Sequence, residues 1–168
     1  MNQESIGEKL LATFGEETIE ETVLFQDQVS VTVSAEAIVA VCRFLKEDSE
    51  LAFDFLSFVG GVDRYPATPR FELIYQLYSL KHNHRFRVKA RVDESEENPA
   101  SIDSVVEVWP TANWHERETA EMFGITFNNH PDPRKLLLPE HWTAHPLRKD
   151  FPLEGTDEDT PDLPREQG

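Results

Sequence analysis

The densest group of side chains able to do chemistry lies in one short run of the chain. This run reads Trp114-His115-Glu116-Arg117-Glu118-Thr119-Ala120-Glu121-Met122-Phe123-Gly124. Glu118 and Glu121 are one helical turn apart, so an enzyme would use their carboxylates as a general acid and base. Alternatively, the carboxylates hold the single guanidinium of Arg117 in a buried or interfacial network, in which bidentate pairing fixes orientation. We favour this second interpretation, in which Trp114 covers the network from water.

Two histidines downstream raise the question of a metal site. His141 and His145 have the i, i+4 spacing of a helical zinc pair. The zincin pattern also requires a glutamate directly after the first histidine, but Trp142 stands there. Pro139 and Pro146 bracket the pair and disfavour a helix that carries both histidines. We therefore expect no metal ligands and no catalytic residues; a stand-alone metal- or acid/base-dependent hydrolase is kept as a distant alternative.

The composition of the chain excludes several classes of protein and of binding site. The chain has 168 residues and a formal net charge of −16, which argues against a nucleic-acid-binding protein. Its single cysteine, Cys42, excludes an internal disulfide and a cysteine-based zinc or iron–sulfur site within this sequence. No apolar run approaches the roughly 20 residues of a membrane span, and the first residues lack the pattern of a signal peptide. We expect a cytoplasmic protein.

Residues 1–98 are expected to form an α/β domain. Hydrophobic periodicity predicts a helix over residues 4–14, strands over 22–25 and 29–33, a helix after Ser34, and strands over 51–59, 71–80 and 84–92. Two of these strands would be joined by a turn at His82-Asn83. Together these elements indicate a mixed, largely antiparallel sheet with flanking helices. Cys42 falls on the apolar stripe of the second helix, where a core position is expected.

A basic stripe follows one of the predicted strands. Arg85, Arg87, Lys89 and Arg91 alternate with apolar residues, so their side chains share one face of the sheet. This face is either a docking surface or the solvated side of a hairpin, and the sequence leaves both interpretations open.

Residues 99–153 are expected to form a helix pair followed by an extended arm. One helix would run from Ser101 to Trp109 and the next would be capped by Asn113, with Glu116 completing a capping box, and would end at Gly124. After the second helix, prolines are too frequent for regular structure, and the apolar side chains between them require a surface to cover them. Residues 154–168 read as a disordered acidic tail. The fold class is α+β.

The run at 114–124 and the segments around it resemble one family: the C subunit of the respiratory NADH:quinone oxidoreductase, complex I, also known as the thirty-kilodalton subunit. The matching downstream pieces are Glu116-Arg117-Glu118, Met122-Phe123-Gly124-Ile125, His130-Pro131-Asp132, Leu136-Leu137, Pro139-Glu140 and Pro146-Leu147-Arg148-Lys149-Asp150-Phe151-Pro152. The matching upstream pieces are Gly61-Val62-Asp63, Arg70-Phe71-Glu72-Leu73-Ile74-Tyr75, Leu80-Lys81, Trp109-Pro110 and Ala112-Asn113-Trp114. The resemblance covers roughly residues 35–153.

The resemblance implies a structural core subunit that binds no cofactor itself. In the parent complex, other subunits hold FMN, iron–sulfur clusters and quinone, and electrons pass from NADH to quinone while protons are translocated. The expected partners are the D and B subunits of complex I, with indirect attachment to the cytoplasmic side of the inner (plasma) membrane. The expected partner interface comprises Trp114, Glu116, Arg117, Glu118, Glu121, His130, Pro131, Arg148, Lys149 and Asp150. The equivalent subunit of a membrane-bound hydrogenase or another quinone reductase is an alternative.

Overall fold

The computed structural model describes residues 3–26 and 28–155. Its elements are α1 (Gln3–Phe14), β1 (Ile19–Phe25), β2 (Gln28–Val33), the 3-10 helix η1 (Ala35–Ala37), α2 (Ile38–Glu47), β3 (Phe55–Asp63), β4 (Phe71–Ser79), β5 (His84–Val92), β6 (Ser101–Asp103), α3 (Ala112–Phe123) and β7 (Thr126–Asn128). Most of the acidic tail predicted for residues 154–168 lies outside the described residues.

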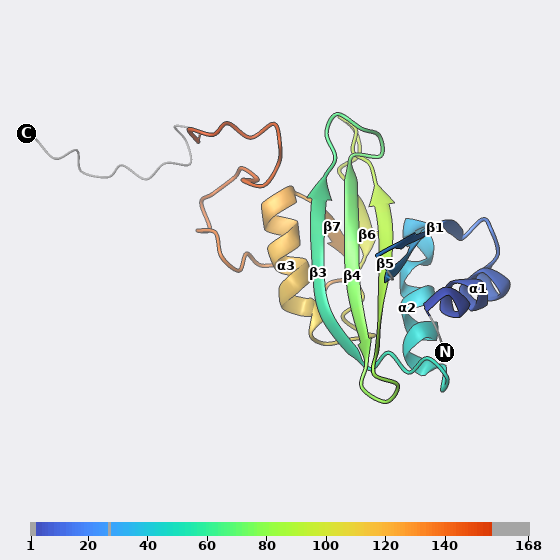
Figure 1. Ribbon diagram of the computed structural model, residues 1–168. Helices are drawn as coiled ribbons and strands as arrows, with labels where there is room; N and C mark the ends of the chain where they lie inside the picture. The colour runs from blue at the N-terminus through green and yellow to red at the C-terminus, as the bar shows by residue number, and fades with distance from the viewer. Residues whose placement is uncertain (1–2, 27, 156–168) are drawn as a thin grey trace, which may run out of the picture.

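Five strands form the main sheet, in the order β1-β2-β5-β4-β3 (Figure 1). The β2–β5 pair is parallel and the other three pairs are antiparallel, which confirms the prediction of a mixed, largely antiparallel sheet. A second, two-stranded parallel sheet is formed by β6 and β7. The hairpin turn between β4 and β5 also lies where it was predicted, and Asn83 adopts a positive φ of 52° there.

The main sheet has a covered face and an open face. Alternate side chains of β4 and β5 point to the covered face and are buried: Phe71, Leu73, Tyr75, Leu77, Phe86, Val88 and Ala90. They share one hydrophobic core with the apolar residues of α1, α2, β6 and β7. Figure 1 shows β6 and β7 behind β3, β4 and β5 and α2 beside β5, with no helix across the front of these strands. The period-2 pattern of the sequence therefore identifies which side of the sheet forms the core.

The first helix of the predicted pair, over residues 101–109, does not form. Residues 101–109 do not form a helix but contain strand β6 and a turn, in which Trp109 N–H donates to the Val105 carbonyl. The strand exists because Ser101–Asp103 pairs with Thr126–Asn128, a distant partner that local propensity does not report. The predicted strand over residues 51–59 is also displaced, because β3 begins at Phe55.

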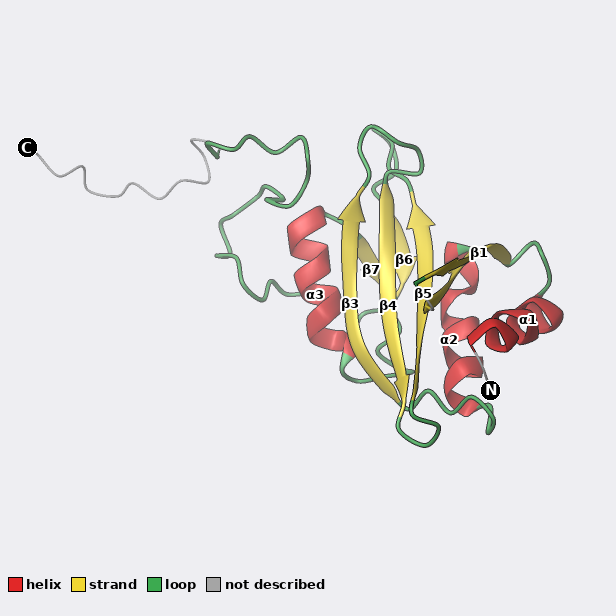
Figure 2. Cartoon of the chain, viewed as in Figure 1, coloured by secondary structure: helices red, strands yellow, loops and turns green. Residues whose placement is uncertain are grey.

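The core continues across the expected boundary at residue 98. Ala100, Ile102 and Trp109 are buried in the same cluster as the residues of the main sheet. The Trp109 indole N–H also donates to the Phe53 carbonyl at 3.0 Å. Residues 100–128 therefore contribute to the same hydrophobic core as the main sheet. Figure 2 shows the irregular segment after β7 on the outer side of α3.

Candidate partner interface

Helix α3 lies close against the edge strand β3 because Gly61 has no side chain. A Cβ atom at Gly61 would stand 2.8 Å from the Phe123 ring and 3.2 Å from the Thr119 methyl group. The helix ends at Gly124, whose φ of 73° is left-handed, and this confirms the predicted C-terminal glycine. The position of α3 on the sheet determines which of its residues face inward and which face the following segment.

Glu116 faces inward and is fully buried. Its carboxylate accepts hydrogen bonds from the Val105 N–H at 2.8 Å and from the Ser104 hydroxyl at 2.6 Å. Burial raises the pKa of Glu116 to about 7, although both hydrogen bonds act in the opposite direction. The predicted capping box is wrong, because the N-cap position of α3 is Thr111 and Glu116 instead holds the β6–α3 connection.

His130 closes the opposite side of this buried carboxyl. Its Nδ1 accepts the Asp132 N–H at 3.0 Å, so we place the ring proton on Nε2, which lies 3.1 Å from the Asn113 carbonyl oxygen. The same Nε2 stands 3.8 Å from Glu116 Oε2. His130 therefore fixes the turn that leads from β7 into the segment beyond.

We call residues 129–155 the arm. Arg117 binds its first part, donating from Nε to the Arg134 carbonyl at 2.7 Å and from Nη2 to the Lys135 carbonyl at 2.9 Å. Its third nitrogen lies 3.3 Å from the Asp132 carboxylate. The guanidinium thus contacts the backbone of the arm and pairs with Asp132, rather than with the neighbouring glutamates that the sequence favoured as its partners.

Glu121 binds the next part of the arm. Its two carboxylate oxygens accept backbone N–H bonds from Leu136, Leu137 and Leu138 at 2.8–3.2 Å. Successive N–H groups that converge on one carboxylate form a backbone anion site. Because both Glu121 oxygens are occupied in this way, the arrangement supports an anchoring role over the acid/base pair with Glu118.

The C-terminal end of α3 binds the arm a third time. His145 Nδ1 lies 2.8 Å from the Glu121 carbonyl oxygen. The Leu147 N–H donates to the Met122 carbonyl at 3.1 Å, and Arg148 Nε donates to the Phe123 carbonyl at 2.6 Å. The last carbonyls of a helix have no partners within the helix and carry its negative dipole end, which favours donors and cations. The arm therefore follows α3 along its whole length.

Beyond α3, a cluster of charges joins the arm to the end of the main sheet. Arg70 donates to Asp63 at 2.8 and 3.0 Å, to Glu94 at 2.7 Å and to Asp150 at 2.8 Å. Arg148 also binds Glu94, at 2.8 Å. The Arg70 guanidinium holds the pKa of Asp63 well below its usual range.

Lys149 completes the cluster through its backbone, because its N–H donates to Asp63 at 2.8 Å. Arg148, Lys149 and Asp150, which the sequence assigned to a partner interface, thus have partners within this chain. Asp63, Arg70 and Glu94 were not assigned to the site, since no spacing in the sequence shows that they meet the arm.

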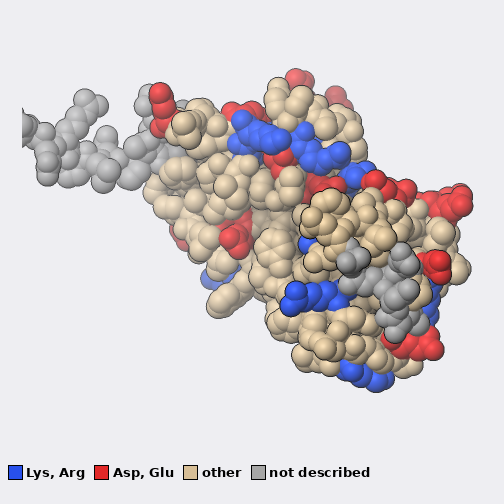
Figure 3. All heavy atoms as spheres, viewed as in Figure 1, with Lys and Arg blue, Asp and Glu red and all other residues tan. Residues whose placement is uncertain are grey.

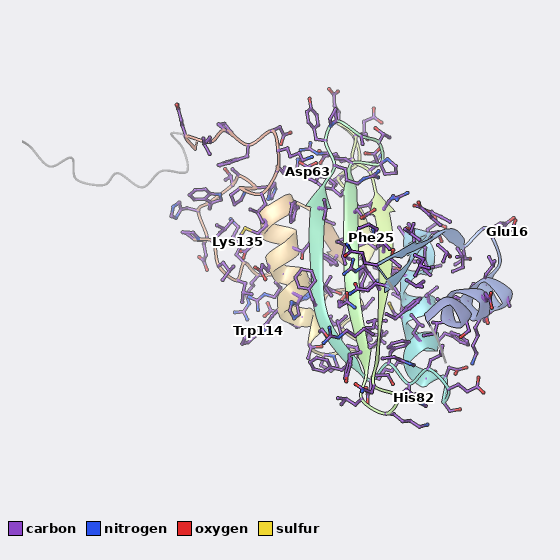
Figure 4. All side chains as sticks on the ribbon, viewed as in Figure 1. Glu16, Phe25, Asp63, His82, Trp114 and Lys135 are labelled. Carbon is purple, nitrogen blue, oxygen red and sulfur yellow. The ribbon has the colours of Figure 1, made fainter. Side chains whose placement is uncertain are left out.

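The contacts leave apolar side chains of α3 and the arm facing outward. Trp114, Leu137 and Leu147 are 69%, 61% and 55% exposed, and Leu153 is fully exposed. Glu118 and Pro131 are also exposed. Figure 4 shows Trp114 near one end of α3. Exposed apolar side chains gathered on an ordered surface are typical of a protein contact.

Metal ligation has no candidate group in the described part of the chain. Within residues 3–26 and 28–155, no three His, Cys, Asp or Glu side chains are placed to hold a metal ion. Of the two histidines singled out by spacing, His145 binds the Glu121 carbonyl and His141 is exposed.

None of the helices described here has the length and apolar character needed to cross a membrane.

Comparisons with known proteins agree on one family. The family model described as the respiratory-chain NADH dehydrogenase 30 Kd subunit matches residues 31–157. The NADH-quinone oxidoreductase C subunit 2 of Rhizobium meliloti (strain 1021) is 54% identical over 73% of this chain, and the match spans 65% of that relative's length. The NADH-quinone oxidoreductase C subunit of Geotalea uraniireducens (strain Rf4) is 47% identical over 79% of this chain and 78% of its own.

A solved structure shares the fold. A chain of the membrane-bound sulfane sulfur reductase, an archaeal respiratory membrane complex, superimposes with a TM-score of 0.70 at 24% identity. The match covers 89% of this chain and 85% of that one. The family match, the relatives and the fold agree with the resemblance of the sequence motifs, and the chain belongs to the thirty-kilodalton subunit family of respiratory-chain NADH dehydrogenase.

Proposed function

We propose that this chain is a core subunit of the peripheral arm of a proton-translocating NADH:quinone oxidoreductase and that its role is to hold other subunits together. Electrons would pass from NADH to quinone through FMN and iron–sulfur clusters in those subunits. The proposed partners are the D subunit, at the quinone site, and the B subunit, with the terminal cluster. Attachment to the cytoplasmic side of the membrane would be indirect, through the complex. Family membership and the names of the relatives support this proposal.

One observation carries the scaffolding role: the arm is ordered on α3 by polar contacts while three of its apolar side chains, Leu137, Leu147 and Leu153, face outward. Arg117 and Glu121 bind backbone groups of the arm, whereas Trp114, Leu137 and Leu147 remain exposed. A surface that is ordered before binding loses less conformational entropy on association. Exposed tryptophan is also among the residues that contribute most at protein interfaces.

The alternatives have weaker support. A stand-alone hydrolase would need free carboxylates, but both oxygens of Glu121 accept backbone N–H bonds. A chain of the membrane-bound sulfane sulfur reductase shares the fold at 24% identity, but relatives named for NADH-quinone oxidoreductase are 40–54% identical to this chain and so favour that complex over a hydrogenase or another quinone reductase.

Complex assembly tests the proposal. A strain that lacks this gene would be complemented with the full-length chain or with Trp114→Ala, and the membranes would be assayed for assembled complex and for NADH:quinone activity. Leu80→Ala is the matched control, because Leu80 is an exposed large apolar residue in the β4–β5 turn, away from α3. We expect the wild type and the control to restore assembly and Trp114→Ala to reduce it about tenfold or more, the range of an interface hot spot.

Full assembly and activity in the deletion strain itself would overturn the proposal. Recovery of the tagged chain from solubilised membranes together with the D and B subunits would support the named partners, and recovery with neither would contradict them.

A further inference from the structure

The open face of the main sheet is a second surface that carries the kinds of side chain found at protein–protein contacts. Its outward side chains are Glu21, Val23 and Phe25 on β1, Ser30 and Thr32 on β2, Arg85, Arg87, Lys89 and Arg91 on β5, Glu72, Ile74, Gln76 and Tyr78 on β4, and Phe55, Phe58 and Val62 on β3. Within the described residues, no helix lies over this face, and in Figure 1 it is the side of β3–β5 turned toward the viewer.

Apolar side chains gather at the two rims of the open face. Phe25 is 68% exposed on β1, and Phe55 and Phe58 are 45% and 46% exposed on β3. Val23 and Val62, on the same two strands, are also exposed. Two apolar rims on one sheet face bring together more exposed aromatic surface than scattered surface residues would.

The basic stripe runs between these rims, and its two halves differ. In one half, Lys89 and Arg91 both pair with Glu72, and Arg91 pairs with Glu21. These cations are therefore neutralised by carboxylates of the same face.

In the other half, the described residues supply no carboxylate partner. Arg87 Nε donates to the amide oxygen of Gln76 at 3.1 Å, and no ion pair involves Arg85 among the residues described. Both arginines border a hollow of about 430 Å³ that Phe55 and Tyr78 also line. Figure 3 shows blue atoms within the tan surface of this face, and red atoms above them. Two guanidinium groups with no carboxylate partner among the described residues are unexpected on a chain whose net charge is −16.

We propose that the open face binds an acidic segment of another subunit of the complex, with one or more carboxylates placed between apolar side chains. The carboxylates would pair with Arg85 and Arg87 in the hollow, where the planar guanidinium favours bidentate pairing. The apolar side chains of the segment would cover the phenylalanines at the rims. This inference rests on the proposed function, since it requires a multi-subunit complex. It gives the chain a second docking face, on the main sheet, whose β3 rim meets α3 where Phe58 lies 6.0 Å from His115 between ring centroids.

Photo-crosslinking in the assembled complex tests the inference. The photoreactive residue p-benzoylphenylalanine would replace Phe25 or Phe55 in the full-length chain, and crosslinked peptides would be identified by mass spectrometry after the complex is purified. The control carries the same residue at Leu80, which is exposed in the β4–β5 turn, beyond the last residue of β4. We expect both open-face positions to crosslink to one acidic segment of another subunit, and the control not to crosslink to it.

Charge variants identify the interaction. Arg85→Glu with Arg87→Glu should reduce the crosslink yield at Phe55 about tenfold or more, whereas Arg85→Lys with Arg87→Lys should reduce it less, since lysine keeps the charge but cannot form the bidentate pairing. A crosslink to residues 156–168 of this chain, a crosslink to a second copy, or no crosslink at either position would overturn the inference. Failure of the proposed function is distinguishable, because the chain would then be missing from the purified complex altogether.

Discussion

The covered face of the sheet and the arm are held in place by different interactions. On the covered face, apolar side chains such as Leu73 and Val88 are fully buried, and their transfer from water stabilises the domain. In the arm, Leu137 and Leu147 face outward, while Arg117 and Glu121 bind its backbone. Side-chain burial fixes the first region, whereas polar contacts to main-chain groups, together with the half-buried Leu136 and Leu138, fix the second.

Because of this difference, we expect the covered face to determine the stability of the fold and the arm to determine assembly with partners. Apolar side chains that are buried in the core cannot contact a partner. The arm, in contrast, is ordered without burying Leu137 or Leu147, and both side chains remain available to a partner. We infer that the core can fold before assembly and that the arm then presents its apolar side chains on an ordered backbone. Changes in the two regions should therefore differ both in the size of their effect and in the measurement that detects it.

The largest effect is expected in the core. Phe86→Ala removes a buried ring from the covered face and should lower the free energy of unfolding by about 3–5 kcal/mol. Urea denaturation of the full-length chain measures this loss. Phe25→Ala is the matched control, because Phe25 is exposed, and should change the free energy by no more than about 0.5 kcal/mol. Equal effects of the two variants would mean that the open face contributes to folding as much as the covered one.

A smaller effect is expected where α3 meets the core, and it depends on pH. The pKa of Glu116 is raised from 4.5 to about 7 in the folded chain, so the folded state binds the proton more tightly than the unfolded state does. Stability from this group is therefore greatest below about pH 4.5 and is lost as pH rises to about 7, by on the order of 3 kcal/mol.

The variant Glu116→Gln tests this linkage. Glutamine can accept the Val105 N–H and donate to the Ser104 hydroxyl, as the protonated acid does, but it does not titrate. Urea denaturation between pH 5 and pH 8 should show a loss of stability in the wild type that is absent in the variant. Parallel pH curves for the two proteins would refute the assignment.

A still smaller effect, confined to the arm, is expected from Glu121→Ala. The N–H groups of residues 136–138 lose their acceptor, which should lower the free energy of opening the arm by about 1–3 kcal/mol. Limited proteolysis should then cut the arm about 5- to 150-fold faster, while the urea midpoint of the core changes little. Glu118→Ala is the control, because Glu118 is exposed on the same helix. Loss of the core's cooperative unfolding in Glu121→Ala would show that the arm and the core are a single unit.

The same contrast explains how much of the fold the sequence predicts. The alternation of Phe86, Val88 and Ala90 with basic residues identifies β5 and its buried face, because burial follows the period of the strand. The segment from Ser101 was misassigned as a helix because its strand depends on pairing with residues 126–128, and local propensity does not reveal that pairing.

The candidate site is predicted in outline only. The charged run on α3 is visible in the sequence, and so is the requirement of the arm for a surface. The partner of each charged residue on α3 cannot be predicted from the sequence. Glu116 points inward and binds Ser104, whereas Glu121 points outward and binds the arm. Contacts from side chains to backbone groups have no sequence period, because any residue can supply the N–H or the carbonyl. The interaction of Arg70 with Asp150 is likewise invisible until the chain is folded.

The smallest effect tests whether charge or geometry holds the arm. Arg117→Lys keeps the positive charge near Asp132, but an ammonium cannot reproduce the fork that reaches the carbonyls of both Arg134 and Lys135. We expect the free energy of opening to fall by about 1 kcal/mol, the contribution of one lost hydrogen bond. Hydrogen exchange of the arm amides would measure this as about fivefold faster exchange, with amides of β4 as the unchanged reference. Wild-type exchange would mean that the charge alone positions the arm, and that the two carbonyl contacts of Arg117 contribute nothing measurable to its order.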